Sequence, residues 1–152
     1  MRDRLDNLRT DAAEGFRAMF ALEDFLRGGP VPNDLLHLVK LRVSQINGCA
    51  FCVDMHVKEA ERGGESSERL HSVATWREAT VFTEPERAAF ELAESATRIA
   101  DAPHGVPDDV WQRAQEHFGE QELSSLVLAI AAINAWNRIS VANRTTPGAF
   151  AR

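Results

Sequence analysis

The residues most able to carry chemistry in this sequence are two cysteines and a histidine that lie close together. Cys49 and Cys52 are the only cysteines among 152 residues, and His56 follows four positions later. If Gly48 turns the chain into a helix that starts at Cys49, spacings of three and four place the three side chains on one helical face. The thiols can then form a disulfide, and the free N–H groups at a helix start lower a thiol pKa. His56 can accept the proton of Cys52 or stabilise its thiolate. The pattern therefore predicts a redox-active cysteine pair.

Two other uses of the same residues are a metal site and plain burial. Cys49, Cys52 and His56 supply three zinc ligands, whereas a structural zinc site has four. Free cysteines are also often buried as small hydrophobic residues. Haem attachment is excluded because Val53 follows the second cysteine, and no βαβ pattern indicates a thioredoxin-like domain. We expect no cofactor and no metal. A fourth zinc ligand would have to come through folding from His37, His71, His104 or His117.

The elements that must position these residues are predicted to be helices along the whole chain. Apolar residues recur at spacings of three and four, and no stretch alternates long enough to form a strand. We expect an all-α, single-domain helical bundle of about six to seven helices, with the Cys-x-x-Cys motif at the N-terminus of a central helix. The domain spans residues 1–152, with its core at about 32–143. The expected helices are about 3–27, 33–47, 49–62, 68–79, 83–100, 108–118 and 120–143.

Capping residues mark several of these boundaries. Asn47 and Gly48 suit a left-handed turn that ends a helix. Thr83 followed by Glu86 has the pattern of a capping box, and Asp108 is expected to cap the short helix after it. The last helix is rich in alanine and nearly uncharged, so it is either central to the core or part of a subunit interface.

Composition and charge exclude several classes of protein. A net charge of -6 without a cluster of Lys and Arg argues against a nucleic-acid binder. No apolar run reaches the roughly 20 residues that span a bilayer. The first residues are charged without an apolar stretch behind them, so no secretory signal is expected. We expect a cytoplasmic protein without nucleic-acid or membrane partners. Lys40, Arg42 and Lys58 are expected to be solvated or interfacial charges.

The stretch from Leu38 to His56, LVKLRVSQINGCAFCVDMH, resembles the core motif of the AhpD-like alkylhydroperoxidases in the carboxymuconolactone decarboxylase superfamily. The stretches from Trp76 to Ala79 and from Ala129 to Arg138 are similar to the same group. The resemblance extends from about Pro32 to Asn143, and the Cys-x-x-Cys-x-x-x-His core is fairly specific.

This resemblance implies an oxidoreductase with antioxidant activity that reduces hydrogen peroxide or organic hydroperoxides. It implies that Cys52 attacks the peroxide and that Cys49 resolves the product as a disulfide. The helix dipole acts most strongly on Cys49, whereas the neighbouring His56 favours Cys52. A lipoyl or thioredoxin-like dithiol partner would reduce the disulfide again, and relatives commonly form trimers or hexamers. We therefore expect a homo-oligomer.

Two positions depart from the family pattern. The family's proton relay starts from a glutamate twelve residues before the first cysteine, and here that residue is His37. Well-known members have a histidine between the cysteines, where this chain has Ala50 and Phe51. His37 can act as a base near neutral pH, or it can be a core histidine bonded to the backbone. It cannot supply the negative charge that would hold His56 as an imidazolium.

The function we expect is a thiol-dependent peroxidase, and its catalytic residues are Cys52, Cys49, His56 and His37. The two departures leave other functions open. One alternative is a non-catalytic redox sensor whose disulfide changes the binding of a partner. Another is an enzyme of the carboxymuconolactone decarboxylase type, which does not generally depend on a cysteine pair.

Overall fold

The computed structural model describes residues 3–148, and every regular element within them is helical. The prediction of an all-α protein is therefore confirmed for this part of the chain, with eight α-helices in place of the expected six to seven. The elements are α1 (Leu8–Asp11), α2 (Ala13–Arg27), α3 (Asn33–Ile46), α4 (Ala50–Arg62), α5 (Ser67–Ser72), η1 (Val73–Thr75), α6 (Glu84–Thr97), η2 (Ile99–Asp101), α7 (Asp108–His117) and α8 (Glu120–Asn143).

The turn between α3 and α4 places the cysteine motif. Gly48 has a φ of 66°, so the predicted left-handed turn is present. We expected Cys49 in the first turn of this helix. It is instead the residue that caps α4. Its sulfur accepts a hydrogen bond from the backbone N–H of Cys52 at 3.3 Å. Cys52 therefore lies in the first turn of α4, where the helix dipole is strongest.

Three predicted helix boundaries are wrong. The helix expected over 3–27 is broken at Ala12. The chain before that break is held by the end of α8, since the Arg4 N–H donates to the Asn143 carbonyl at 2.8 Å. The helix expected over 68–79 ends at Ser72, before the buried Val73. The residue that caps α7 is Pro107, not Asp108, and it makes no side-chain capping bond. By contrast, the capping box of Thr83 and Glu86 is confirmed.

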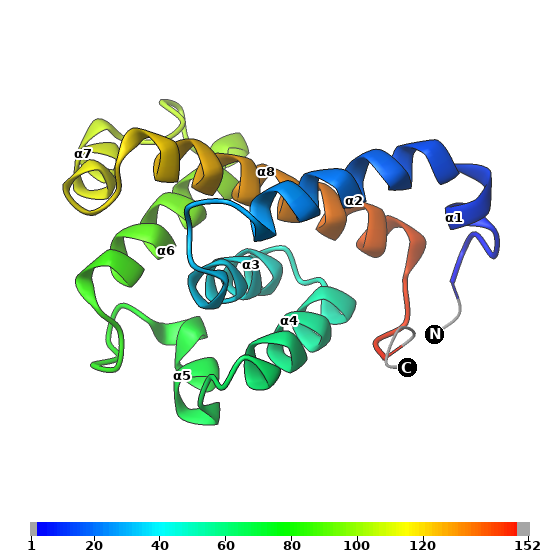
Figure 1. Cartoon of the computed structure of the whole chain (residues 1–152), viewed down its shortest axis with the longest axis horizontal. Coiled ribbons are helices and arrows are strands. Elements are labelled where there is room, and N and C mark those ends of the chain that lie inside the picture. Colours follow the sequence, from blue (N-terminus) through cyan, green and yellow to red (C-terminus); the bar gives the residue numbers. More distant parts are fainter. Residues whose placement is uncertain (1–2, 149–152) are drawn as a thin grey trace.

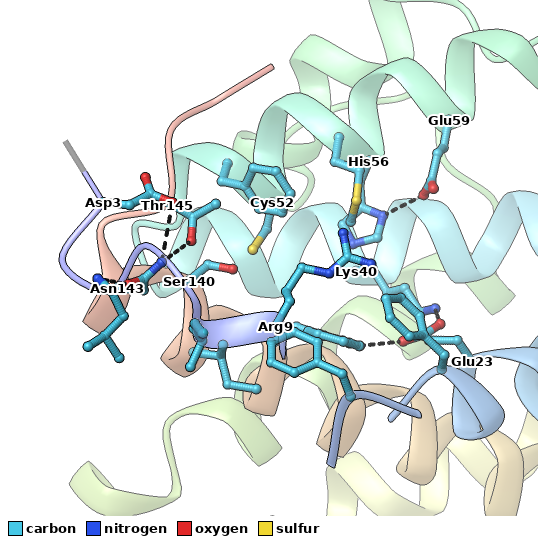
Figure 2. Close-up of a pocket in the computed structure, with 18 of the residues that line it drawn as sticks. Asp3, Arg9, Glu23, Lys40, Cys52, His56, Glu59, Ser140, Asn143 and Thr145 are labelled. Atoms are coloured by element: carbon cyan, nitrogen blue, oxygen red, sulfur yellow. Dashed lines mark hydrogen bonds and ion pairs between the residues drawn. The ribbon is translucent and has the colours of Figure 1, made fainter. Parts of the chain in front are cut away.

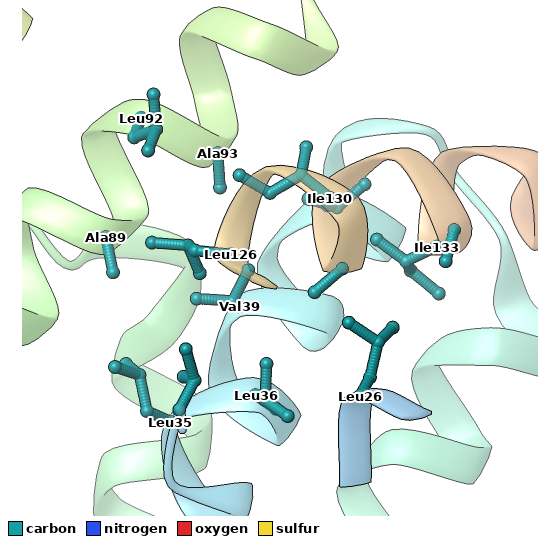
Figure 3. Packing of buried hydrophobic residues seen from close by; sticks show 14 of the residues in the cluster. Leu26, Leu35, Leu36, Val39, Ala89, Leu92, Ala93, Leu126, Ile130 and Ile133 are labelled. Carbon is teal, nitrogen blue, oxygen red and sulfur yellow. The ribbon is translucent and has the colours of Figure 1, made fainter. Parts of the chain in front are cut away.

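The core forms around α3, which packs against α4, α6 and α8 (Figure 1). Helix α2 lies along α8, and α8 also contacts α3 and α6. Burial on several sides explains why α3 is apolar around most of its circumference. Figure 3 shows the side chains that meet between these four helices, which are Leu26, Leu35, Leu36, Val39, Ala89, Leu92, Ala93, Leu126, Ile130 and Ile133.

A partly buried amide network fixes the turn that carries the cysteines. Asn47, at the end of α3, donates to the side-chain oxygens of Asn134 and Asn137 on α8, at 2.9 Å each. Asn137 in turn donates to the hydroxyl of Ser44 at 3.0 Å. Because buried amides are costly to leave unpaired, this network holds the start of α4 against α8.

One helix in the described part of the chain, α8, is long and apolar enough to cross a membrane by length and composition alone. A central core helix passes the same test, and α8 contributes Leu126, Ala129 and Ile133 to the core. This position agrees with the expected core role, while Val127, Leu128 and Val141 are exposed on the same helix, so its role in a subunit interface stays a prediction.

Candidate active site

A cavity of about 670 Å³ lies between the N-terminal segment and helices α1, α2, α3, α4 and α8 (Figure 2). Much of its wall is apolar, with Phe16 and Phe20 from α2, Phe51 from α4 and Trp136 from α8. The side chains of Phe16, Phe20 and Trp136 pack on one another, with ring centroids 5.4–6.4 Å apart. The cavity brings together three of the four candidate residues, namely Cys52, His56 and His37.

The two cysteines form a disulfide, with their Cα atoms 5.3 Å apart. Both are buried, but they face different spaces. Cys52 lines the large cavity, whereas Cys49 lines a smaller cavity of about 280 Å³ next to the end of α8. The disulfide therefore lies between two cavities, and each cavity faces one of its sulfurs.

His56 is buried one turn after Cys52 on α4, and its ring is fixed by a carboxylate. Its Nδ1–H donates to Oε2 of Glu59 at 3.0 Å, as Figure 2 shows. Its other ring nitrogen, Nε2, is buried and has no hydrogen-bond partner. Fixing Nδ1 as the donor leaves the Nε2 lone pair available to take a proton.

Glu59 is not among the residues predicted from the sequence to be catalytic, although it flanks His56. The negative charge that His37 cannot supply comes from this residue, one turn beyond His56. Burial alone would raise the pKa of Glu59, but the hydrogen bond from His56 and the charges of both histidines outweigh it and hold the pKa below its ordinary value. Glu59 is therefore ionised at neutral pH. Its spacing of three from His56 is the signal that points to this contact.

His37 projects from α3 onto the same carboxylate. Its Nδ1 lies 3.5 Å from Oε2 of Glu59 and makes no hydrogen bond, so it is not a core histidine bonded to the backbone. Its ring centroid lies 6.4 Å from that of His56. Burial lowers the pKa of His37 more than the Glu59 carboxylate raises it, and His56 and Lys40 lower it further.

A buried ion pair borders the cavity beside these residues. Lys40, one turn after His37, is only 7% exposed and pairs with Glu23 of α2. Glu23 also accepts a hydrogen bond from Nε1 of Trp136 at 3.1 Å. The expectation of a solvated or interfacial Lys40 is therefore wrong, because α2 folds over it and supplies a compensating charge.

The chain is similar to proteins of one family. The profile of the carboxymuconolactone decarboxylase family matches residues 11–95 of the chain. The uncharacterized protein YdfG of Bacillus subtilis (strain 168) is 40% identical over 131 residues, which are 86% of this chain and 88% of that protein.

Solved structures of similar proteins have the same fold. A protein of unknown function from Agrobacterium tumefaciens, ATU0492, described as a candidate antioxidant defence protein AhpD, is 40% identical and superposes with a TM-score of 0.90. The match covers 96% of this chain and 98% of that one. A peroxidase-related protein from Ralstonia eutropha JMP134 shares the fold with a TM-score of 0.78 at 21% identity, over 92% of this chain and 74% of the other.

Proposed function

Since the chain belongs to the carboxymuconolactone decarboxylase family, among its AhpD-like members, we propose that it is a thiol-dependent peroxidase. The observation that carries the proposal is the Cys49–Cys52 disulfide, whose second sulfur faces a largely apolar cavity beside an oriented histidine. The two cysteines react with the peroxide, and His56 transfers the proton. Glu59 orients His56, and His37 assists as a neighbouring base.

The cycle begins when Nε2 of His56 takes the proton of the Cys52 thiol. Glu59 supports this step because it fixes the tautomer of His56 and stabilises the imidazolium that forms. The position of Cys52 in the first turn of α4 stabilises the thiolate further. The start of the helix stabilises both sulfurs, so the large cavity and His56 are what favour Cys52 as the attacking residue.

The Cys52 thiolate then attacks the terminal peroxide oxygen, and the O–O bond breaks. The oxygen becomes part of a sulfenic acid on Cys52, and the departing alkoxide takes the proton from His56 to give an alcohol. The Cys49 thiol condenses with the sulfenic acid to form the disulfide and releases water. The sum is one hydroperoxide and two thiols converted to one alcohol, one water and one disulfide.

Reduction by a dithiol of the lipoyl or thioredoxin-like kind completes the cycle. The apolar walls of the cavity favour organic hydroperoxides over hydrogen peroxide as substrate, since they offer contacts that only a carbon skeleton can use. A cytoplasmic location and a homo-oligomer, trimer or hexamer, are part of the same proposal.

The proposal predicts that reduced protein loses both thiols when one equivalent of cumene hydroperoxide is added. The loss should be faster than with hydrogen peroxide, because the aromatic substrate is held by the cavity. Free thiols are counted with a chromogenic disulfide under anaerobic conditions, in the presence of a chelator. Thiols that persist after a tenfold excess of either peroxide would contradict the proposal.

Glu59→Gln is expected to slow oxidation of Cys52 by roughly 10²-fold, because an amide neither stabilises the imidazolium nor enforces the tautomer. The measurement is the rate of thiol loss under the same conditions. Reduction of the preformed disulfide by dihydrolipoamide should change much less, which separates a role in the first step from general damage. Glu59→Asp should recover part of the rate, and Glu61→Gln, an exposed change on the same helix, should have no effect.

A further inference from the structure

Three metal-binding side chains converge on one edge of the large cavity. They are His37 from α3 and His56 and Glu59 from α4. Each offers one ligand atom, and the three atoms lie within 4.8 Å of one another. This set differs from the Cys49, Cys52 and His56 set that the sequence suggested for zinc, because it needs no thiolate.

The distances within the cluster suit a small divalent ion. Zinc binds nitrogen and oxygen ligands at about 2.0–2.1 Å, and tetrahedral geometry then separates the ligand atoms by roughly 3.3 Å. Oε2 of Glu59 lies 3.0 Å from Nδ1 of His56 and 3.5 Å from Nδ1 of His37. His37 must move toward the other two ligand atoms to complete the site.

A second observation points to a bound cation. Nδ1 of His37 is buried without a hydrogen bond although it lies near a carboxylate oxygen. A proton on Nδ1 of His37 or a metal ion between the two atoms would satisfy both of them. Within the cluster, Nδ1 of His37 is therefore a buried ligand atom that no protein group uses.

The surroundings are compatible with a metal ion. Lys40 is the nearest cation on α3, and its charge is compensated by Glu23. The large cavity leaves the open side of the cluster free for water or another small ligand, as in metal sites with three protein ligands. Two imidazoles and one carboxylate favour ions such as Zn²⁺ over Mg²⁺ or Ca²⁺, which prefer oxygen ligands.

We propose that His37, His56 and Glu59 bind a divalent transition-metal ion of the Zn²⁺ class, with the remaining coordination position open to the cavity. The binding itself does not depend on the proposed peroxidase function. If that function holds, the ion regulates it, because a metal bound to the ring of His56 and to Glu59 removes the base and its partner from the thiol.

The test is a calorimetric titration of the oxidised full-length protein with zinc sulfate after treatment with a chelator. The disulfide keeps both sulfurs out of reach, so we expect saturable binding of one ion per chain. His37→Gln and Glu59→Gln should each weaken binding at least about tenfold. His117→Gln removes an exposed histidine on α7 and should leave the affinity unchanged. Both test positions are partly exposed, so these variants should keep the fold, which circular dichroism can verify.

Cobalt gives an independent readout, since Co²⁺ at a four-coordinate site absorbs strongly in the visible range. The wild-type protein should show this band, and the His37→Gln variant should not. Equal zinc affinity in wild type and both test variants, or no binding up to millimolar zinc, would overturn the proposal. Peroxidase activity is measured separately on reduced protein with a chelator present, so either proposal can fail while the other stands.

Discussion

Cys52→Ser is expected to abolish turnover of organic hydroperoxides, with a loss on the order of 10³-fold or more. A serine hydroxyl is far less acidic than a thiol, and neither His56 nor the first turn of α4 can ionise it near neutral pH. The measurement is consumption of cumene hydroperoxide with dihydrolipoamide as reductant. Turnover at the wild-type rate would contradict the assignment of Cys52.

Cys49→Ser is the matched variant for this prediction, since it lies on the other side of the same disulfide. It should still consume one equivalent of peroxide in the absence of reductant, because Cys52 and His56 are intact. The sulfenic acid then has no resolving thiol and can be trapped on Cys52 with dimedone and located by mass spectrometry. A trapped sulfenic acid on Cys49 of the Cys52→Ser variant would reverse the two roles.

These experiments also separate the peroxidase from the alternatives. A disulfide that forms stoichiometrically but is not turned over by a lipoyl or thioredoxin-like dithiol would favour a redox sensor. Activity on a lactone acid that survives in a variant without either cysteine would favour an enzyme of the decarboxylase type.

Glu94→Gln is expected to lower the free energy of unfolding by about 3 kcal/mol at pH 7, which corresponds to roughly 6–12 °C in Tm. Glu94 on α6 is only 7% exposed. It accepts hydrogen bonds from Nε1 of Trp76 at 2.9 Å and from Nε of Arg42 at 2.6 Å, and it also pairs with Arg77. The substitution leaves Arg42, whose side chain is 13% exposed, without a compensating charge in the interior.

The same residue makes stability depend on pH. Burial alone would raise the pKa of Glu94, but the hydrogen bonds from Trp76, Arg77 and Arg42 outweigh it and hold the pKa below its ordinary value of 4.5. Its contribution is therefore complete above about pH 5 and is lost as the pH falls through the lowered pKa of the folded state.

Urea denaturation between pH 3 and pH 8 can measure both effects. The wild type should lose stability more steeply on acidification than Glu94→Gln does. Glu91→Gln breaks the more exposed pair with Arg113 and serves as the control, with an expected cost below about 1 kcal/mol. Equal stability of the two variants at pH 7 would show that the buried cluster contributes little.

The environment of Arg42 illustrates why buried ion pairs between helices cannot be predicted from the sequence. Arg42 and Lys40 were expected to be solvated or interfacial charges, yet both are mostly buried in ion pairs with residues of other helices. Glu23 lies 17 positions from Lys40, and Glu94 lies 52 positions from Arg42. The spacing of neighbouring residues does not indicate these ion pairs, because they form only when the helices pack.

The sequence by itself determined the helical periodicity, the left-handed turn at Gly48 and the proximity of Cys49 and Cys52. These features depend on residues three or four positions apart, whose geometry is set by the helix and its cap. Only the tertiary structure decided which carboxylate holds His56, where His37 points and how large a cavity faces Cys52. Those outcomes depend on how α2, α3, α4 and α8 pack, since side chains from different helices meet only through the shared core.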